Sequence, residues 1–298
     1  MSGFDIITFT TDFGWAGGYV SICEGIVARV RPEARVFHIS HETPVGDIDA
    51  GALTLERVAP SFPPAVHLAL VDPGVGTNRR PLVLTTARGD LLVGPDNGLL
   101  LPAAEALGGL STAWCLDTSL VRTKAGLAAA QVSSTFHGRD VFTPAAALLS
   151  GETRPPAIAS PIDPAALVRL IPAFNEVTPE EAVSQVIEID RFGNVGLALR
   201  FANLVPREEQ EVGRQARFLV EVVGEDTPKW IARVVRTFAE LGSGELGVYR
   251  DSWDQAALAV KAASAAELLS LTRGMKVRLT ALNKPPYPPT PLSEGLPT

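Results

Sequence analysis

The sequence is poor in cysteine, with only Cys23 and Cys115 among its 298 residues. Two cysteines cannot form a disulfide framework or a cysteine-rich metal site. Both stand in apolar, periodic stretches, so we expect two small buried side chains. The four histidines and the acidic residues near them also lack the spacing of metal ligands. We therefore expect no metal site.

Long apolar runs and basic clusters are missing as well. No apolar stretch reaches the ~18 residues of a membrane span, and residues 2–5 lack the basic start of a secretion signal. The formal net charge is −7, from 26 Lys+Arg against 33 Asp+Glu. Such a balance, without a Lys/Arg cluster, disfavours nucleic acid as a partner. We expect a cytoplasmic protein that acts on a small molecule, with no membrane or nucleic-acid partner.

Familiar nucleotide-binding motifs are also absent. No Gly-x-x-x-x-Gly-Lys-Ser/Thr phosphate loop occurs, and Gly74-Val75-Gly76 lacks the third glycine of a dinucleotide fingerprint. Asp12-Phe13-Gly14 spells the metal-binding tripeptide of kinases, but no catalytic loop or strand lysine precedes it. We therefore reject a kinase.

The first half of the chain alternates between strand and helix patterns, which predicts an α/β domain over residues 1–153. Alternation of this kind favours a mostly parallel sheet with helices on both faces. The expected strands are 6–10, 34–39, 65–71, 82–86, 91–93 and 113–116, and the expected helices are 20–30, 48–58, 99–107 and 140–150.

The second half has a different composition. Six prolines between residues 154 and 180 indicate a linker without regular structure. Short strand patterns then follow at turn-rich spacing over residues 181–283, which predicts a smaller β-barrel domain. The expected strands are 184–189, 195–199, 218–223, 230–235, 258–260 and 276–281, with one helix at 263–269. Residues 284–298 are expected to form a loose tail.

Polar residues follow the first and third predicted strands of the first domain and also precede a later helix. They are Thr11–Gly14, Asp72–Arg80 and Thr135–Asp140. Open α/β sheets bind ligands beyond the carboxyl ends of their strands, so these segments are candidate site loops. Asp12 suits the two hydroxyls of a ribose, or else caps a turn or helix. His137 lies in a polar loop before a helix, whereas His38 and His67 fall in apolar strands and are expected to be packed.

Five short motifs occur along the chain in a characteristic order. They are ITFTTDFG at 7–14, VDPGVGTNR at 71–79, GPDNG at 94–98, FHGRD at 136–140 and DRFGN at 190–194. Together they resemble the S-adenosyl-L-methionine (SAM) hydroxide adenosyltransferase family, hydrolases related to the SAM-dependent fluorinase and chlorinase. The resemblance extends to about residue 282.

The resemblance implies an α/β domain followed by a β-barrel, assembled as a homotrimer. Its sites would lie between the first domain of one subunit and the second domain of a neighbour. The implied reaction is displacement at C5′ of SAM by water or hydroxide, giving adenosine and L-methionine. SAM is then the substrate, and no cofactor is implied.

The resemblance also assigns site residues. The catalytic set matches Asp72, Arg79 and His137. The substrate-binding positions match Asp12 for the ribose, Phe192 and Asn194 for adenine, Asp190 for the ammonium and Ser252 for the carboxylate of the methionine part.

The chemistry fits these residue types. Water, with a pKa of about 15.7, is a poor nucleophile and needs a base or an anion-stabilising group. Neutral imidazole at His137 can take the proton, and Asp72 can hold its tautomer or the water. Arg79 would stabilise hydroxide character. Because Arg80 adjoins it, the sequence leaves open which arginine is catalytic.

Two positions depart from the family pattern. Gly46 stands where relatives place an aromatic ring against the ribose, and Trp15 is a possible substitute. Lys261 begins Lys-Ala-Ala where relatives often have Asn-Gln-Gly near adenine.

Two other functions stay open at this point. A halogenase would use halide instead of water, but the Asp72 carboxylate would repel it. A non-catalytic adenosine or SAM sensor would need only the binding residues.

Overall fold

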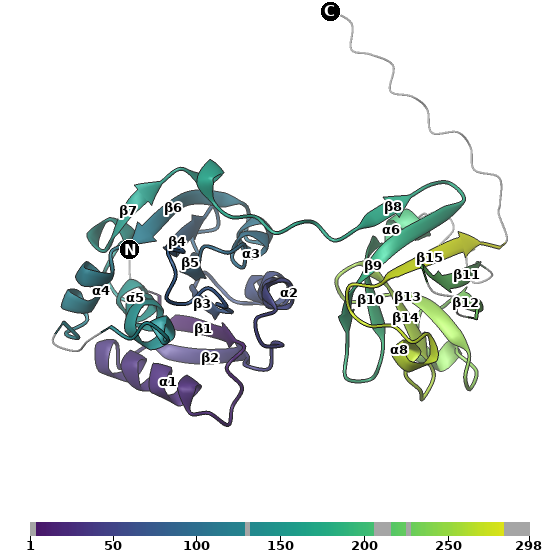
Figure 1. Cartoon of the computed structure of the whole chain (residues 1–298), viewed down its shortest axis with the longest axis horizontal. Helices are drawn as coiled ribbons and strands as arrows, with labels where there is room; N and C mark the ends of the chain where they lie inside the picture. Colours follow the sequence, from purple (N-terminus) through teal and green to yellow (C-terminus); the bar gives the residue numbers. More distant parts are fainter. Residues whose placement is uncertain (1–3, 129–131, 206–215, 225–227, 283–298) are drawn as a thin grey trace, which may run out of the picture. The chain divides into compact units, whose positions relative to one another are not determined.

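The computed structural model describes residues 4–128, 132–205, 216–224 and 228–282. The chain forms two compact units, Met1–Ile171 and Pro172–Thr298, each with its own core (Figure 1). Among the described residues, no helix is long and apolar enough to cross a membrane. The predicted tail, 284–298, lies outside the described residues.

The first unit contains one sheet with strand order β2-β1-β3-β5-β4-β6-β7. Strands β2, β1, β3 and β5 run parallel, whereas β4, β6 and β7 join by antiparallel pairs. The strands are β1 (Ile6–Thr11), β2 (Arg35–Ser40), β3 (Val66–Leu70), β4 (Pro81–Thr86), β5 (Leu91–Pro95), β6 (Leu110–Leu116) and β7 (Ala159–Ile162).

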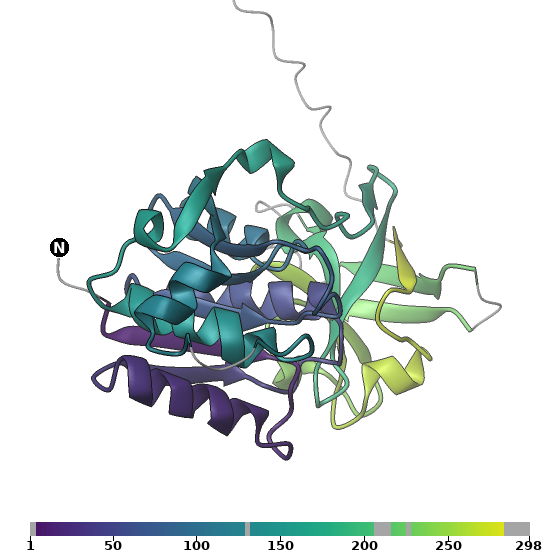
Figure 2. The ribbon, with the colours of Figure 1, turned by 60° about the vertical axis from the view of Figure 1, so that its left-hand side comes forward.

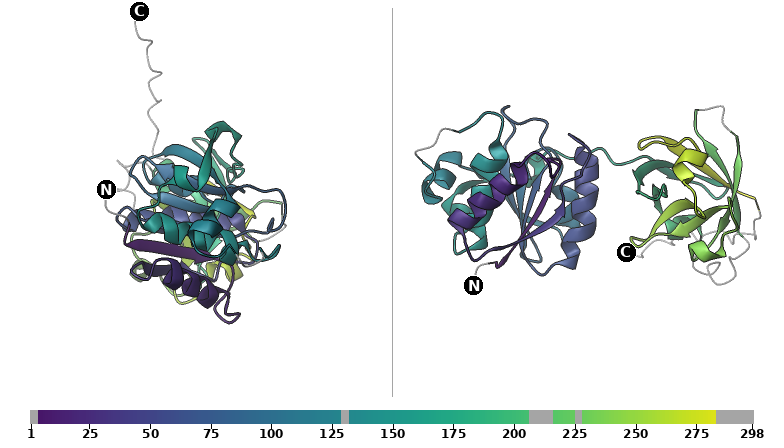
Figure 3. Two further views of the ribbon diagram at one scale, coloured as in Figure 1. Left: turned by 90° about the vertical axis from the view of Figure 1, so that its left-hand side faces the viewer. Right: turned by 90° about the horizontal axis from the view of Figure 1, so that it is seen from below.

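Helices cover both faces of this sheet, as predicted. Their bounds are α1 (Tyr19–Val30), α2 (Ile48–Val58), α3 (Leu101–Ala106), α4 (Thr118–Lys124) and α5 (Thr143–Ser150). Apolar side chains of α1, α4 and α5 share one core with β1 and β3, and those of α2 and α3 share another with the opposite face. Figure 2 and the right panel of Figure 3 show α1 (purple) and α2 (blue) on either side of the strands.

The second unit is a β-barrel, also as predicted. Its strands follow the order β10-β14-β13-β12-β11-β15-β9, and pairing of β10 with the second half of β9 closes the ring, while β8 pairs with the first half of β9. The elements are β8 (Asn175–Val177), β9 (Glu181–Ile189), β10 (Val195–Arg200), α6 (Phe201–Leu204), β11 (Arg217–Val222), β12 (Trp230–Val234), β13 (Leu246–Arg250), β14 (Gln255–Val260), α8 (Ala265–Leu268) and β15 (Lys276–Ala281).

The proline-rich segment 154–180 differs from the prediction of a linker without regular structure. Its residues include β7, which pairs with β6, and β8, which pairs with β9. Pro161 is tolerated in β7 because β7 ends the strand order of its sheet, and an edge strand can lack a donor.

Smaller outcomes concern elements, cysteines and His67. The sequence patterns missed α4, α6 and β13. Cys23 is buried as expected, but Cys115 is partly exposed. His67 is packed as expected, at 0% exposure.

A buried ion network explains why His67 is tolerated in the core. Asp90, at 0% exposure, accepts hydrogen bonds from the His67 ring, from Arg88 and from the backbone N–H of Ala65. Burial opposes the Asp90 charge, but the hydrogen bonds from Arg88 and His67 outweigh it and hold the pKa of this carboxyl well below its usual range. The carboxylate thus anchors the β4–β5 hairpin to β3.

Replacing this carboxylate should destabilise the fold. We expect Asp90→Ala to lower the free energy of unfolding by about 3–5 kcal/mol, because Arg88 and His67 lose a buried partner. Denaturant titration measures this, with exposed Asp49→Ala on α2 as the control, expected to change stability by no more than about 1 kcal/mol. Equal effects of the two substitutions would contradict the anchoring role.

Candidate active site

Two acidic side chains lie at the carboxyl ends of two neighbouring strands. Asp12 follows β1 and Asp72 follows β3 shortly after its end, and β1 and β3 run parallel with Thr11 beside Leu70. His137 comes from the other side, immediately before the π-helical turn η2 (Gly138–Phe142). These three polar side chains line one cavity of about 210 Å³, whose remaining wall is largely apolar. The structure therefore brings together candidates from three separate motifs.

Arg79 joins Asp72 and His137 directly. Its Nε lies 3.0 Å from each Asp72 carboxylate oxygen, and its Nη2 donates both to Asp72 Oδ2 and, over 2.9 Å, to His137 Nδ1. Both side chains of the ion pair are largely buried, Arg79 at 9% and Asp72 at 11% exposure. The guanidinium also lies 4.8 Å from the centre of the Phe142 ring. It is held between a carboxylate, an imidazole and an aromatic face.

This geometry fixes the protonation state of His137. A guanidinium can only donate, so His137 Nδ1 must accept, and in the neutral ring the proton is then on Nε2. Burial first, and the Arg79 charge second, lower the pKa of His137, with Asp72 opposing them. The ring is therefore neutral near pH 7. Of the two roles expected for Asp72, holding the tautomer of His137 is indirect, through Arg79, and holding the water stays a prediction.

Arg80 has a different role from its neighbour. Its Nε donates to Asp96 over 2.7 Å, and its Nη2 donates to the Ala166 carbonyl. Asp96 also accepts the backbone N–H of Val168. The Arg80–Asp96 pair thus fastens residues 166–168 to the sheet, and Arg79 is the arginine that meets Asp72 and His137.

Asp12 is held by the loop that contains Gly46. The Gly46 N–H donates to Asp12 Oδ2 over 2.8 Å. Gly46 has a φ of +73°, a left-handed conformation that a side chain at this position would strain. One carboxylate oxygen of Asp12 is thereby fixed by backbone, which leaves the other for a ligand. Trp15 does not line the cavity; its ring packs on His38 and His41 instead.

One residue that the sequence reasoning passed over fixes the loop of His137. Asp140, in η2, accepts the Ser133 N–H over 2.7 Å and two hydrogen bonds from Arg139. These bonds tie the segment before His137 to the turn after it. In the sequence, Asp140 ended both the polar segment Thr135–Asp140 and the FHGRD motif, but neither gave it a role.

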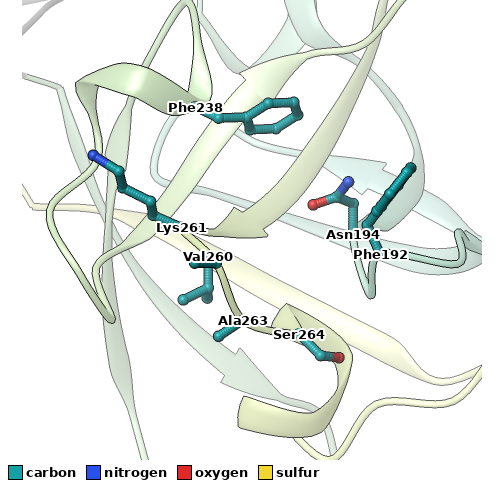
Figure 4. A pocket seen from close by; sticks show the side chains of 8 residues that line it. Phe192, Asn194, Phe238, Val260, Lys261, Ala263 and Ser264 are labelled. Carbon is teal, nitrogen blue, oxygen red and sulfur yellow. The ribbon is translucent and has the colours of Figure 1, made fainter.

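The barrel unit holds a second cavity, of about 600 Å³, at the DRFGN turn between β9 and β10. Phe192 and Asn194 lie on one side, and Phe238 and the 260–264 loop with Lys261 face them (Figure 4). Phe192 is 74% exposed, and an exposed aromatic ring at the edge of a cavity is typical of a surface that binds a ligand or partner. Sequence patterns gave no signal for Phe238, because a single aromatic residue in a turn has no periodicity.

Two further barrel candidates have defined places. Asp190 organises the DRFGN turn: Oδ1 accepts the N–H groups of Phe192 and Asn194, and Oδ2 accepts the Asn194 side-chain amide over 2.7 Å. Gly193 sits against Ser264, where a Cβ would clash at 2.2 Å, so only glycine fits. Ser252 is exposed in the turn between β13 and β14 and does not line the cavity with Phe192 and Asn194.

Within the described residues, no group of three or more His, Cys, Asp or Glu side chains could hold a metal ion.

Comparisons with known proteins identify relatives over most of the chain. Residues 7–159 match the model of the SAM hydroxide adenosyltransferase N-terminal domain, and residues 184–278 match that of the C-terminal domain. The chain is 43% identical to an (R)-S-adenosyl-L-methionine hydrolase of Salinispora tropica over 92% of this chain and 97% of that protein. A hydrolase of the same name from Thermus thermophilus is 38% identical, over 92% and 98% of the two chains.

Two solved structures are similar in fold over most of the chain. An uncharacterized conserved protein from Thermotoga maritima superposes with a TM-score of 0.81 at 29% identity, covering 92% of this chain and 99% of that one. A conserved hypothetical protein from Thermus thermophilus superposes with a TM-score of 0.69 at 33% identity, over 92% and 98%.

The two adjacent arginines should affect His137 differently. We expect Arg79→Gln to raise the pKa of His137, because the cation that opposes its protonation is removed while Asp72 remains. Arg80→Gln should leave that pKa unchanged, since Arg80 pairs with Asp96. NMR titration of the His137 ring tests both. An unchanged His137 pKa in Arg79→Gln would contradict the hydrogen bond at Nδ1.

Proposed function

This chain belongs to the SAM hydroxide adenosyltransferase family, and from that premise we infer that it is a SAM hydrolase, which converts SAM and water to adenosine and L-methionine. The names of its relatives specify the (R) epimer, which we propose as the substrate here as well. The observation that carries this proposal is the contact of Arg79 with both Asp72 and His137 beside the cavity that Asp12 lines. A binding protein has no need of this cluster.

We propose the following roles for the three residues. The Nε2–H of neutral His137 donates to the oxygen of the attacking water, and Asp72, which lines the same cavity, accepts one of its protons. Arg79 lies between them, and its fixed positive charge stabilises hydroxide character as the O–H bond weakens. The proposed proton acceptor thus moves from His137 to Asp72, because the only basic nitrogen of His137 already accepts from Arg79.

The bond changes balance without a further reactant. The water oxygen forms a bond to C5′, the C5′–sulfur bond breaks with its electron pair going to sulfur, and one proton leaves the water. The sulfonium is already a good leaving group, so no acid is needed on that side. An anionic nucleophile and a sulfonium lose charge as they combine, so a cavity with apolar walls favours the step.

The remaining candidates fit the rest of the substrate. We propose that Asp12 holds the ribose hydroxyls through its second carboxylate oxygen, and that Phe192 and Asn194 contact adenine at the exposed barrel cavity. Asp190 is proposed to meet the ammonium of the methionine part through Oδ2, which accepts one hydrogen bond in the turn, whereas Oδ1 accepts two. Ser252 is proposed for the carboxylate. A halide would meet the Asp72 carboxylate, which disfavours a halogenase.

Hydrolysis in oxygen-18 water tests this function. Purified protein and (R)-SAM should give adenosine labelled at its 5′ oxygen, together with unlabelled L-methionine. Asp72→Asn and His137→Ala should each lower turnover by about 10²–10⁴-fold, as expected for proton transfer and electrostatic stabilisation. Asp49→Ala serves as the control. Release of adenosine without label, or no adenosine at all, would refute the proposal.

We further propose that the protein is a homotrimer whose sites combine the first unit of one subunit with the barrel of its neighbour. Supporting this, the catalytic and ribose candidates all belong to one unit, while the adenine and methionine candidates all belong to the other. Each unit by itself thus carries candidates for only part of the substrate.

Mixing two inactive variants tests such shared sites. Asp12→Ala and Asn194→Ala, coexpressed with different tags and purified through both, should regain about a third of wild-type turnover, because in every mixed trimer one of the three sites joins an intact first unit to an intact barrel. Each variant alone should stay impaired. A mixture no more active than its components, or an active monomer in sedimentation, would rule out shared sites.

A further inference from the structure

Four side chains outside the catalytic cluster form one continuous row of hydrogen bonds. Glu24 on α1 contacts His38 Nε2 at 3.1 Å, and His38 Nδ1 lies 2.7 Å from His41 Nε2. His41 Nδ1 then lies 2.8 Å from the hydroxyl of Thr11, the last residue of β1. The row runs from the protein surface to the residue directly before Asp12. The proposed reaction uses none of these four.

The chemistry of the two ends fixes the direction of the row. An ionised Glu24 carboxylate can only accept, so His38 carries its proton on Nε2 and accepts at Nδ1. His41 therefore donates from Nε2 and accepts at Nδ1, which makes the Thr11 hydroxyl the donor there. With both rings neutral, every ring nitrogen of His38 and His41 has a hydrogen-bond partner.

The surroundings of His41 favour this neutral state. Its side chain is at 0% exposure, and the rings of Phe9 and Trp15 lie 4.9 Å and 4.6 Å from its centre. Burial and the neighbouring His38 lower the pKa of His41 to about 4. A neutral ring whose Nδ1 accepts the Thr11 hydroxyl is thus the resident form at neutral pH.

His41 also connects the two loops that hold Asp12. Besides its ring contact to Thr11, its carbonyl accepts the Gly14 N–H over 2.8 Å. The Thr11 hydroxyl oxygen in turn accepts the Phe13 N–H over 3.1 Å, which closes a tight turn around Asp12. In the loop that follows His41, the Gly46 N–H donates to Asp12 Oδ2. Asp12 is therefore held from both sides by the segment that begins at His41.

We propose that His41, acting through the Thr11 hydroxyl, is a positioning residue that sets the Asp12 carboxylate for the ribose hydroxyls. This inference rests on the proposed function, in which Asp12 binds the ribose. His41 touches no substrate; it keeps the turn at residues 11–14 in the geometry in which Asp12 lines the cavity. Trp15, which packs on His38 and His41, is fixed by the same row.

The test measures whether a substitution at His41 removes the preference for a nucleoside that carries ribose hydroxyls. Calorimetry on the full-length wild type should show adenosine binding about 10²-fold tighter than 2′,3′-dideoxyadenosine. The second nucleoside lacks both ribose hydroxyls, so the Asp12 carboxylate loses two charge-assisted hydrogen bonds. In His41→Phe, which keeps a ring of similar size, this ratio should fall to below about 10-fold. Turnover at saturating SAM should fall much less than the affinity.

A pair of substitutions at Thr11 separates positioning from folding. Thr11→Ser keeps the hydroxyl and should retain the wild-type ratio of the affinities for adenosine and 2′,3′-dideoxyadenosine. The isosteric Thr11→Val should lower this ratio as His41→Phe does. Exposed Glu42→Gln, next to His41, is the control and should bind both nucleosides as the wild type does. Thr11→Val also decides the matter if His41→Phe does not fold.

The possible outcomes are distinct. A His41→Phe or Thr11→Val protein that binds more weakly but keeps the full preference for adenosine would overturn the inference, since the two residues would then be structural only. A wild type that binds neither nucleoside would instead count against the proposed function itself.

Discussion

The ion pair between Asp72 and Arg79 is the interaction on which the candidate site depends. Each charge is about nine-tenths buried, a costly state that the other partner offsets. The two contacts from Nε to the carboxylate fix the plane of the guanidinium, and that plane aims Nη2 at His137. The protonation state of the histidine thus follows from the placement of an aspartate that it does not touch. Three residues from three segments act as a single unit.

Much of this arrangement could be predicted from local sequence. Buried strands such as Val66–Leu70 are short and almost wholly apolar, so polar residues just beyond them mark the edge of the sheet where ligands bind. Helix Ile48–Val58 was predicted with its observed bounds because Asp47 caps it and its apolar spacing is regular. The barrel followed from short strands at turn-rich spacing. Motif order then indicated which loops belong together.

What local sequence could not give are pairings between distant residues. Nothing in the local sequence distinguishes Arg80 from its neighbour Arg79. The difference is that Asp96, sixteen residues further on, accepts a hydrogen bond from Arg80. His41 likewise gave no signal, because its partner Thr11 is distant in the sequence and meets it only after β1 and β2 pair. Strand β7 was missed because proline discourages strands in general, while the edge of a sheet tolerates it.

The π-helical turn beside His137 makes the site sensitive to how the backbone is wound there. A π-helix holds one more residue than an α-helix of the same span, and such turns arise when a residue is inserted into an α-helix. Here five residues, Gly138–Phe142, take that form and lead directly into α5. If these same five residues wound as an α-helix instead, what precedes them would rotate by about 100°, the step of one α-helical residue. His137 would then leave Arg79 while every side chain of the cluster remained in the sequence. In chains with this fold, the winding of that turn therefore matters as much as its side chains when a relative is judged for hydrolase chemistry.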